Sequence, residues 1–130
     1  MKNIKLNFGF VCDYAFFSEG QKLNIIGTFK NISVSSVPAK HSQMFIVTNA
    51  SVDESGDYEQ VLKLVREEDG VELNNIKINL TVNKVGDEPA ELGFLGQLND
   101  LVFEKEGKYS FKLFINGDLI GEVPLQITKI

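Results

Sequence analysis

The sequence predicts an all-β fold, a single antiparallel β-sandwich of about eight strands that spans residues 1–130 as one domain. Three observations favour this fold. Apolar residues recur with the period of two that marks strands, short polar turns separate the apolar stretches at regular spacing, and an Asn-Gly pair, the favoured two-residue hairpin turn, lies near the end. The sandwich is expected to be immunoglobulin-like or jelly-roll-like, with a closed β-barrel as the alternative. The lack of tryptophan and of a cysteine pair argues against an antibody-type core.

The first predicted strand covers residues 3–16. Apolar and polar residues alternate through this segment, so every second side chain is expected on one face of the strand. The residues assigned to that face are Ile4, Leu6, Phe8, Phe10 and Cys12. The Ser-Glu-Gly-Gln stretch at residues 18–21 then predicts a turn.

A second strand is predicted over residues 22–35. Gly27 lies inside it, which indicates a bulge or a close approach of another backbone. Residues 38–41 are expected to end this strand and form a loop, and a third strand rich in Phe, Ile and Val follows over residues 43–52.

The segment 58–67 is ambiguous, because its apolar residues fit both helical and strand spacing. Its short length and flanking turn residues favour a strand. The Glu-Glu-Asp-Gly stretch at 67–70 predicts a hairpin turn, with a partner strand over residues 73–82. The segment 92–103 is less regular, and part of it is expected to be an irregular strand or a single helical turn.

The last two strands are the clearest in the sequence. Alternating residues over 109–115 lead into Asn116 and Gly117, a pair that favours the type I′ hairpin turn because both positions need a positive φ. The return strand carries apolar residues at alternate positions over 123–127. Pro124 has no backbone donor, so this strand is expected to lie at an edge or to carry a bulge there.

Three groups of residues in the N-terminal half resemble a family of small uncharacterised bacterial proteins. The residues that carry the resemblance are Cys12-Asp13-Tyr14-Ala15, then Gly20-Gln21-Lys22-Leu23-Asn24-Ile25-Ile26-Gly27-Thr28-Phe29, then Pro38 and His41. The closing hairpin, residues 107–117, is also similar to that family, although such hairpins recur in many β-sandwiches. The family is a domain of unknown function, so the resemblance implies a β-sandwich of bacterial type and no particular activity.

The amino-acid composition and net charge disfavour several classes of binding partner. The net charge of −5 disfavours binding to the phosphate backbone of nucleic acids. No apolar run approaches the roughly 20 residues that would cross a membrane, and the N-terminus lacks the apolar block of an export signal. The single cysteine allows no intrachain disulfide, which is typical of a reducing compartment. A cytoplasmic protein that binds neither nucleic acid nor membrane is therefore expected.

No combination of residues predicts catalysis, so a protein without enzymatic activity is expected. The chain has one histidine and one cysteine, so a nucleophile–base pair could only be built from Cys12 and His41. Cys12 falls at an inward strand position and is expected to be a buried, inert thiol. His41 is expected to lie in a loop, with its imidazole bonded to nearby backbone. Phosphate-binding glycine motifs are also missing.

No cofactor is expected, and the acidic turns are weak candidates for a metal site. One cysteine and one histidine cannot make a usual zinc site. Calcium prefers six to eight oxygen ligands, and a cluster would form only if two acidic turns meet at one end of the sandwich. The weak candidates are Asp53, Glu54, Asp57, Asp87 and Glu88. A ligand-binding module that holds calcium, a sugar or a small molecule in these loops is the alternative function.

Aromatic residues provide the leading hypothesis. Phe16 and Phe17 are adjacent, so in a strand of period two they cannot both face the core, and Phe114 also falls out of the inward phase. Exposed aromatics are typical of partner surfaces, although loops that cover both sheet faces would explain them equally well. The sequence therefore favours a non-catalytic interaction or structural protein. It would bind itself or a protein partner through a sheet edge or through these aromatics.

Overall fold

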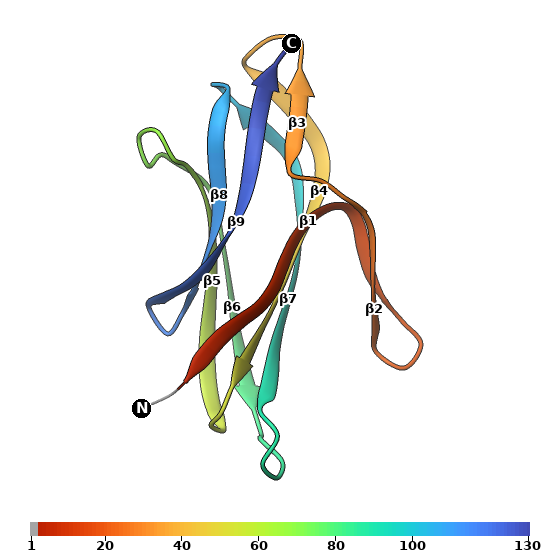
Figure 1. Ribbon diagram of the computed structural model, residues 1–130, viewed down its shortest axis with the longest axis vertical. Coiled ribbons are helices and arrows are strands. Elements are labelled where there is room, and N and C mark those ends of the chain that lie inside the picture. Colours follow the sequence, from red (N-terminus) through yellow and green to blue (C-terminus); the bar gives the residue numbers. More distant parts are fainter. Residues whose placement is uncertain (1–2) are drawn as a thin grey trace.

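A computed structural model describes residues 3–130, and these residues form nine strands and no helix (Figure 1). No helix in this part of the chain could therefore cross a membrane. The strands are β1 (Ile4–Ser18), β2 (Lys22–Thr28), β3 (Asn31–Val34), β4 (Ala39–Val52), β5 (Gly56–Arg66), β6 (Glu72–Val82), β7 (Ala90–Phe103), β8 (Gly107–Ile115) and β9 (Asp118–Lys129).

The strands form two sheets that pack face to face, as the β-sandwich prediction requires. One sheet has the order β2-β1-β4-β7 and the other has the order β3-β9-β8-β5-β6. Every pair of neighbours is antiparallel except β3 and β9, which are parallel at the edge of the five-stranded sheet, so the predicted antiparallel sandwich is confirmed apart from this one pair. The core between the sheets is apolar and includes Met44 and Ile46 of β4 and Leu62 and Leu64 of β5.

A β-bulge in β1 overturns the expected single apolar face of this strand. Leu6 pairs with Ala50 of β4, but Phe8 pairs with Asn49, so one extra residue stands between them. A one-residue insertion moves every following side chain to the other face of a sheet. Ile4 and Leu6 therefore pack on the core between the sheets, whereas Phe8 and Cys12 belong to a second cluster outside it.

The predicted strand 22–35 is divided into β2 and β3, which lie in different sheets. Phe29 and Lys30 make the crossing. The N–H of Phe29 donates to the carbonyl of Val11 in one sheet at 3.0 Å, and the carbonyl of Lys30 accepts from Gln126 in the other at 2.7 Å. Gly27 has a φ of 69°, and a Cβ there would lie 3.2 Å from the Cβ of Asp13, so this glycine makes room for a side chain of the neighbouring strand and not for the predicted bulge or close approach of another backbone.

Two further segments differ from the sequence prediction. The expected loop at 38–41 is wrong beyond Pro38, because β4 already begins at Ala39 and continues for 14 residues. The segment expected to be irregular, 92–103, lies within the continuous strand β7, and its irregularity is confined to Asp100, which has a φ of 56°. The ambiguous segment 58–67 is a strand, since β5 covers nearly all of it.

The C-terminal hairpin follows the sequence prediction closely. Asn116 and Gly117 have φ angles of 51° and 88°, as a type I′ turn requires. On its outer side β9 pairs with β3 only from Gln126 to Lys129, so Pro124 lies where β9 has no second neighbour. The missing N–H of Pro124 therefore breaks no ladder hydrogen bond, and it protects this edge from pairing with another chain.

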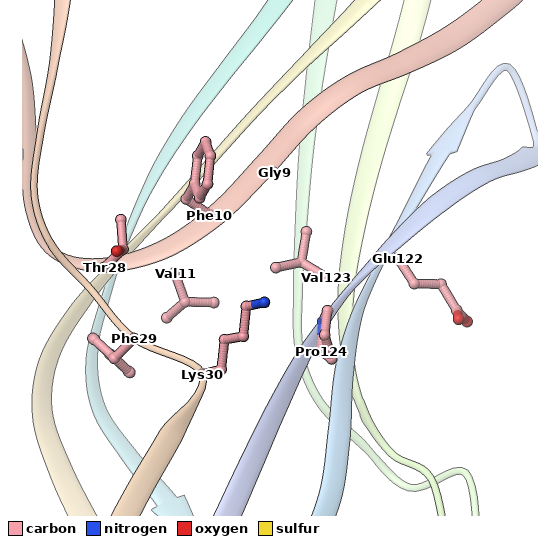
Figure 2. Close-up of a pocket in the computed structure, with 9 residues that line it drawn as sticks. All are labelled: Gly9, Phe10, Val11, Thr28, Phe29, Lys30, Glu122, Val123 and Pro124. Atoms are coloured by element: carbon pink, nitrogen blue, oxygen red, sulfur yellow. The ribbon is translucent and has the colours of Figure 1, made fainter.

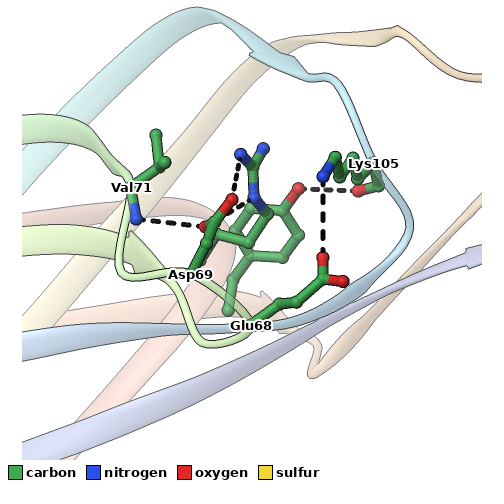
Figure 3. Close-up of polar contacts among 6 residues, drawn as sticks. Glu68, Asp69, Val71 and Lys105 are labelled. Atoms are coloured by element: carbon green, nitrogen blue, oxygen red, sulfur yellow. Dashed lines mark hydrogen bonds and ion pairs between the residues drawn. The ribbon is translucent and has the colours of Figure 1, made fainter.

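The turn between β5 and β6 is held by Asp69 (Figure 3). Its carboxylate accepts two hydrogen bonds from the guanidinium of Arg66, at 2.9 and 2.7 Å, and one from the backbone N–H of Val71 at 3.2 Å. The hydrogen bonds from Arg66 are the main reason that the pKa of Asp69 is lowered from 3.8 to about 2. Beside it, Glu68 pairs with Lys105 at 3.8 Å.

Two buried tyrosines each anchor the start of their own strand by a hydrogen bond to the backbone of the preceding loop. The hydroxyl of Tyr109 in β8 donates to the carbonyl of Lys105 at 2.6 Å, and that of Tyr58 in β5 donates to the carbonyl of Glu54 at 2.7 Å. In both cases the acceptor precedes the tyrosine by four residues. This is the arrangement of the tyrosine corner known from immunoglobulin-like sandwiches, and it ties each entering loop to its strand.

Candidate interaction surface

The two outer faces of the sandwich differ sharply in charge. On the outer face of the five-stranded sheet, Lys77 pairs with Glu59 at 3.0 Å. Lys63 pairs with Glu72 at 3.8 Å. Lys112 lies between Glu67 and Glu122 and bonds both. Several ion pairs therefore lie on this face, as is typical of a sheet surface that contacts water.

The same charged face holds Phe114, one of the three aromatics proposed from the sequence as interface residues. Phe114 is half-buried, and the ammonium group of Lys63 lies 5.1 Å from the centre of its ring. The structure therefore places Phe114 beneath a charged side chain, apart from Phe16 and Phe17 in the other sheet.

The outer face of the four-stranded sheet carries aromatic, aliphatic and neutral polar side chains instead. Its residues form cross-strand rows of one member each from β1, β4 and β7. From one end to the other, the rows are Cys12–Phe45–Gln97, Phe10–Val47–Leu95, Phe8–Asn49–Gly93 and Lys5–Ser51–Glu91. Charged residues occur only in the last of these four rows. We call these four rows the neutral face.

Neutral hydrogen bonds organise the polar end of the neutral face. The bulge residue Asn7 donates from its side-chain amide to Asn49 at 2.8 Å and to Ser51 at 2.6 Å. The bulge therefore has two effects. It turns Phe8 and Phe10 outward, and it places an amide where it crosslinks β1 and β4 without introducing a charge.

The hairpin of β1 and β2 covers the opposite end of the neutral face. Beyond Cys12, β1 leaves β4 and pairs only with β2, and Figure 1 shows this hairpin bending away from the rest of the sheet and turning back along its outer side. Ala15, Leu23 and Ile25 of the hairpin pack in one cluster with Cys12 and Phe45. The hairpin thus buries Cys12 and Phe45 of the first row. Val47, Leu95 and Phe8 of the next two rows belong to the same cluster, so the hairpin covers part of these rows as well, while Phe10, Gln97 and Gly93 stay exposed.

Several large apolar side chains on β1 and β2 remain exposed. Phe10 is 40% exposed, and the hairpin adds Tyr14 at 48%, Ile26 at 53% and Phe17 at 55%. Of the proposed aromatics, Phe17 therefore lies on the surface, while Phe16 is half-buried and its ring lies 5.4 Å from that of Tyr14. The sequence reasoning missed Phe10, because it placed this residue on the inward face that the bulge reverses.

Cys12 and His41 do not form a catalytic pair in any contact that the structure shows. Cys12 is fully buried beneath the hairpin, its thiol faces the carbonyl of Phe45 at 3.8 Å, and burial raises the pKa of the thiol. The expectation of a buried cysteine is confirmed, although the residue lies outside the main core. The expectation that His41 lies in a loop is wrong, because it belongs to β4 and its ring lies 6.0 Å from that of Phe29.

Residues from all three groups that carry the family resemblance line one shallow hollow of about 290 Å³. Asp13, Gly27, Phe29 and His41, which are separated in sequence by up to 28 positions, meet there with Thr28, Asn31 and Ile32. The motifs therefore have a shared structural role. They set the point at which β1, the end of β2 and the start of β4 come together and the chain crosses between the sheets.

The weak metal-site candidates lie in two turns and, for Asp57, at the start of β5. The two turns touch each other, since the hydroxyl of Ser55 accepts from the backbone N–H of Lys84 at 2.8 Å. Their carboxylates do not converge. Asp53 accepts from the backbone of Asn3 at 3.0 Å, and Asp57 accepts from Thr81 at 2.7 Å. Within residues 3–130, no three Asp, Glu, His or Cys side chains, including Glu54, Asp87 and Glu88, group as a metal site would require.

A larger hollow of about 450 Å³ opens between the edges of the two sheets (Figure 2). It is bounded by residues 9–11 of β1, the crossing segment 28–30 and residues 122–124 of β9. Figure 2 shows that Val11 points toward this hollow while Phe10 points to the other side of β1. Lys30 and Glu122 are its charged lining residues, and no histidine, cysteine or aspartate lines it.

Comparison with solved structures supports the fold alone. The alkylpurine DNA glycosylase AlkC of Pseudomonas fluorescens, solved with DNA that contains an abasic site analog, is similar with a TM-score of 0.51 and 7% identity over 96% of this chain. The chain spans 30% of that protein's length. An immunoglobulin-like protein from Pseudomonas aeruginosa gives a TM-score of 0.47 and 13% identity over 96% of both chains.

Sequence comparison gives one family. The model of a family described as a family of unknown function, DUF6941, matches residues 7–128. No curated protein sequence matches the chain.

Proposed function

The chain belongs to DUF6941, a family of unknown function, and we propose that it is a non-catalytic interaction module that binds protein through the neutral face. The observation that carries this proposal is the contrast between the two outer faces of one sandwich. Ion pairs cover one face, whereas the other presents aromatic and neutral polar side chains with charges only at one end.

Physical chemistry explains why this contrast points to protein binding. An outward face of a sheet that only meets water is expected to be polar and charged. The centres of protein interfaces are depleted of charged residues and enriched in aromatic ones, because a buried charge must be desolvated. Phe10 is 40% exposed in the second row of the neutral face, on the β1 side, so its burial against a partner would remove apolar surface from water.

The same face is poorly suited to nucleic acid. Binding to a phosphate backbone requires several lysines or arginines, and Lys5 is the one basic residue in the four rows of the neutral face. The net charge of −5 adds a repulsive term. We therefore propose a protein partner rather than DNA, RNA or a membrane. The buried, reduced Cys12 supports a reducing location such as the cytoplasm.

A site-specific photo-crosslinker tests this proposal in the native host. Benzoylphenylalanine in place of Phe10 is expected to form a covalent adduct with a protein. The same group in place of Leu119, which is 51% exposed on the other sheet, serves as the matched control and is expected to form none. Adducts of equal yield from both positions, or none from either, would overturn the proposal.

A further inference from the structure

We infer that two copies of this chain pair edge to edge along β6, antiparallel and about a two-fold axis at Ile78, so that their five-stranded sheets join into one continuous sheet. This inference goes beyond the proposed function and uses a different surface. Three observations carry it. The edge formed by β6 is long and regular, its inward apolar side chains are only half-buried, and the pattern of its residues is complementary to itself.

The strand β6 is the outermost strand of the five-stranded sheet, and within residues 3–130 it pairs with β5 alone. Its register with β5 shifts next to Leu73 and is then unbroken from Asn74 to Val82. Over residues 74–82 there is no proline and no positive φ. An edge of this kind offers a row of unpaired N–H and C=O groups to which another strand can add.

The other open edges carry features that disfavour such pairing. The strand β3 has only four residues, and Pro124 lies where β9 has no second neighbour. On β7, the carbonyl of Gly93 accepts a hydrogen bond from the side chain of Gln60 at 3.3 Å, and Asp100 interrupts the strand with a φ of 56°. On β2, Gly27 has a φ of 69°. Bulges, prolines and short strands protect sheet edges from other chains, so β6 is the edge best suited to pairing.

The inward side chains of β6 gain from a second strand at this edge. The residues Ile76, Ile78, Leu80 and Val82 pack on the main core, yet each is only half-buried. By contrast Leu62, which pairs with Ile76 from the neighbouring strand β5, is 2% exposed. The core is therefore still open to water along the outer side of β6. A second β6 would cover this apolar surface, which favours association.

A two-fold axis at Ile78 pairs the whole regular stretch with itself. Asn74 and Val82 are equally far from Ile78, so antiparallel pairing begins and ends where the regular stretch does. Residues directly opposite each other in antiparallel strands point to the same face of the sheet. Ile78 therefore faces Ile78 of the second copy, and Ile76 faces Leu80 of the second copy, so the inward contacts across the axis are apolar.

The charges fit the same register. Lys77 is the one charged residue of the stretch 74–82, and it comes to face the amide of Asn79 of the second copy. An axis at Lys77 would instead place two lysines directly opposite each other, which is unfavourable. Beyond the two ends of the stretch lie Glu72 and Lys84. Antiparallel pairing therefore brings the acidic end of one copy to the basic end of the other.

The rest of the chain leaves this edge accessible. Figure 1 shows that the turn between β5 and β6 bends outward, away from the four-stranded sheet, while the loop after β6 leads to β7 in that sheet. The strand β7 lies beneath β6, where the side chain of Ile76 would lie 3.3 Å from a Cβ at Gly96. Neither connection therefore lies in the plane in which a second β6 would add.

Disulfide crosslinking tests the register directly. Ile78→Cys places two thiols opposite each other across the axis, with their Cα atoms about 4.5–5.5 Å apart, which a disulfide can span. Ile76→Cys is the matched control, because the two copies of position 76 would be offset by four residues, or about 14 Å. The native Cys12 is fully buried and does not compete. Mild oxidation should give a covalent dimer for Ile78→Cys and none for Ile76→Cys, and equal yields would overturn the inferred register.

A charge variant tests the contact in the absence of any crosslink. Asn79→Lys puts an ammonium group opposite Lys77 of the second copy, and the two-fold axis repeats this repulsion, so self-association is expected to fall about tenfold. Within its own chain, position 79 lies opposite Glu59, so the monomer should keep its thermal stability. Thr81→Lys adds the same charge to the same edge but faces Asn75 of the second copy. This matched control should associate like wild type.

Light scattering over a range of concentrations gives the mass of each variant. Wild type and Thr81→Lys should reach twice the chain mass of 14.5 kDa at concentrations where Asn79→Lys has moved toward 14.5 kDa. The double variant Lys77→Glu/Asn79→Lys should regain the wild-type association, because it restores opposite charges across the axis. A wild-type monomer at every concentration, or a dimer that Asn79→Lys leaves unchanged, would overturn the inference. Phe10→Ser lies on the other sheet and should leave this dimer intact, so a dimer lost in that variant would overturn it as well.

Discussion

Leu6 and Phe8 are two residues apart in one strand, yet their side chains lie on opposite faces of the four-stranded sheet. Without the bulge between them, Phe8 and Phe10 would point between the sheets, where the space is already filled by the main core. The bulge therefore creates the neutral face from a sequence that alternates regularly. The features of the fold on which this account depends can each be measured.

Tyr109→Phe is expected to destabilise the protein by about 1 kcal/mol, because the carbonyl of Lys105 loses a hydrogen bond of 2.6 Å. Chemical denaturation gives the free energy of unfolding. Tyr14→Phe is the matched control, since Tyr14 is 48% exposed and should change stability by less than about 0.5 kcal/mol. Equal effects of the two variants would mean that the tyrosine corner contributes nothing.

Gly121→Ala is expected to destabilise the protein by about 1 to 3 kcal/mol through overpacking. A Cβ at this position would lie 3.2 Å from the Cβ of Leu6 and 3.4 Å from its Cγ, where β1 passes close to β9. Gly93→Ala is the control, because its Cβ would meet nothing within 4 Å. A neutral Gly121→Ala would show that β1 and β9 do not approach closely.

Acid should lower the free energy of unfolding over the pH range in which Asp69 takes up a proton. Its pKa is about 2 in the folded protein and 3.8 without the contacts, so the unfolded chain binds the proton more readily. The contribution of Asp69 is therefore complete above about pH 4 and is lost as the pH falls toward 2. Chemical denaturation at pH values between 2 and 5 gives the free energy of unfolding as a function of pH. The slope of this free energy against pH should be smaller for Asp69→Asn than for wild type. An identical slope would contradict the role given to the Arg66 pair.

The thiol of Cys12 should react only after unfolding. It is fully buried beneath the hairpin, and burial raises its pKa, so little thiolate is present at neutral pH. A disulfide reagent such as Ellman's reagent is expected to titrate the thiol in denaturant and to react very slowly with the native protein. Rapid reaction of the native thiol would show that the hairpin opens readily from the neutral face.

Local sequence signals predicted most of the strands, and tertiary geometry explains the errors. The Asn116-Gly117 turn and the strand at 58–67 are both found because their signals are local. The bulge after Leu6 has no such signal, since Asn7 continues a regular alternation and the register depends on β4, more than 40 residues away. The exposure of Phe17 could be inferred from its neighbour, but that of Phe10 could not, because it follows from the bulge.

The crossing of the chain between the two sheets at Phe29 and Lys30 also has no local signal in the sequence. The residues around it read as one continuous strand, and only the separate partners of the two halves, Val11 and Gln126, divide it. The difference in charge between the outer faces of the two sheets also could not be predicted from the sequence. The sequence shows scattered charges, and only the pairing of β1, β4 and β7 reveals that one face contains so few of them.

The crosslinking of two phenylalanine variants to a protein partner tests the neutral face most directly. Phe10 and Phe114 lie on the outer faces of different sheets, so Phe10→Ser and Phe114→Ser remove the same side chain from the two surfaces. In the native host, chemical crosslinking should give an adduct of the 14.5 kDa chain with a different protein for wild type and Phe114→Ser, and none for Phe10→Ser. Association that survives Phe10→Ser but is lost in Phe114→Ser would contradict the account.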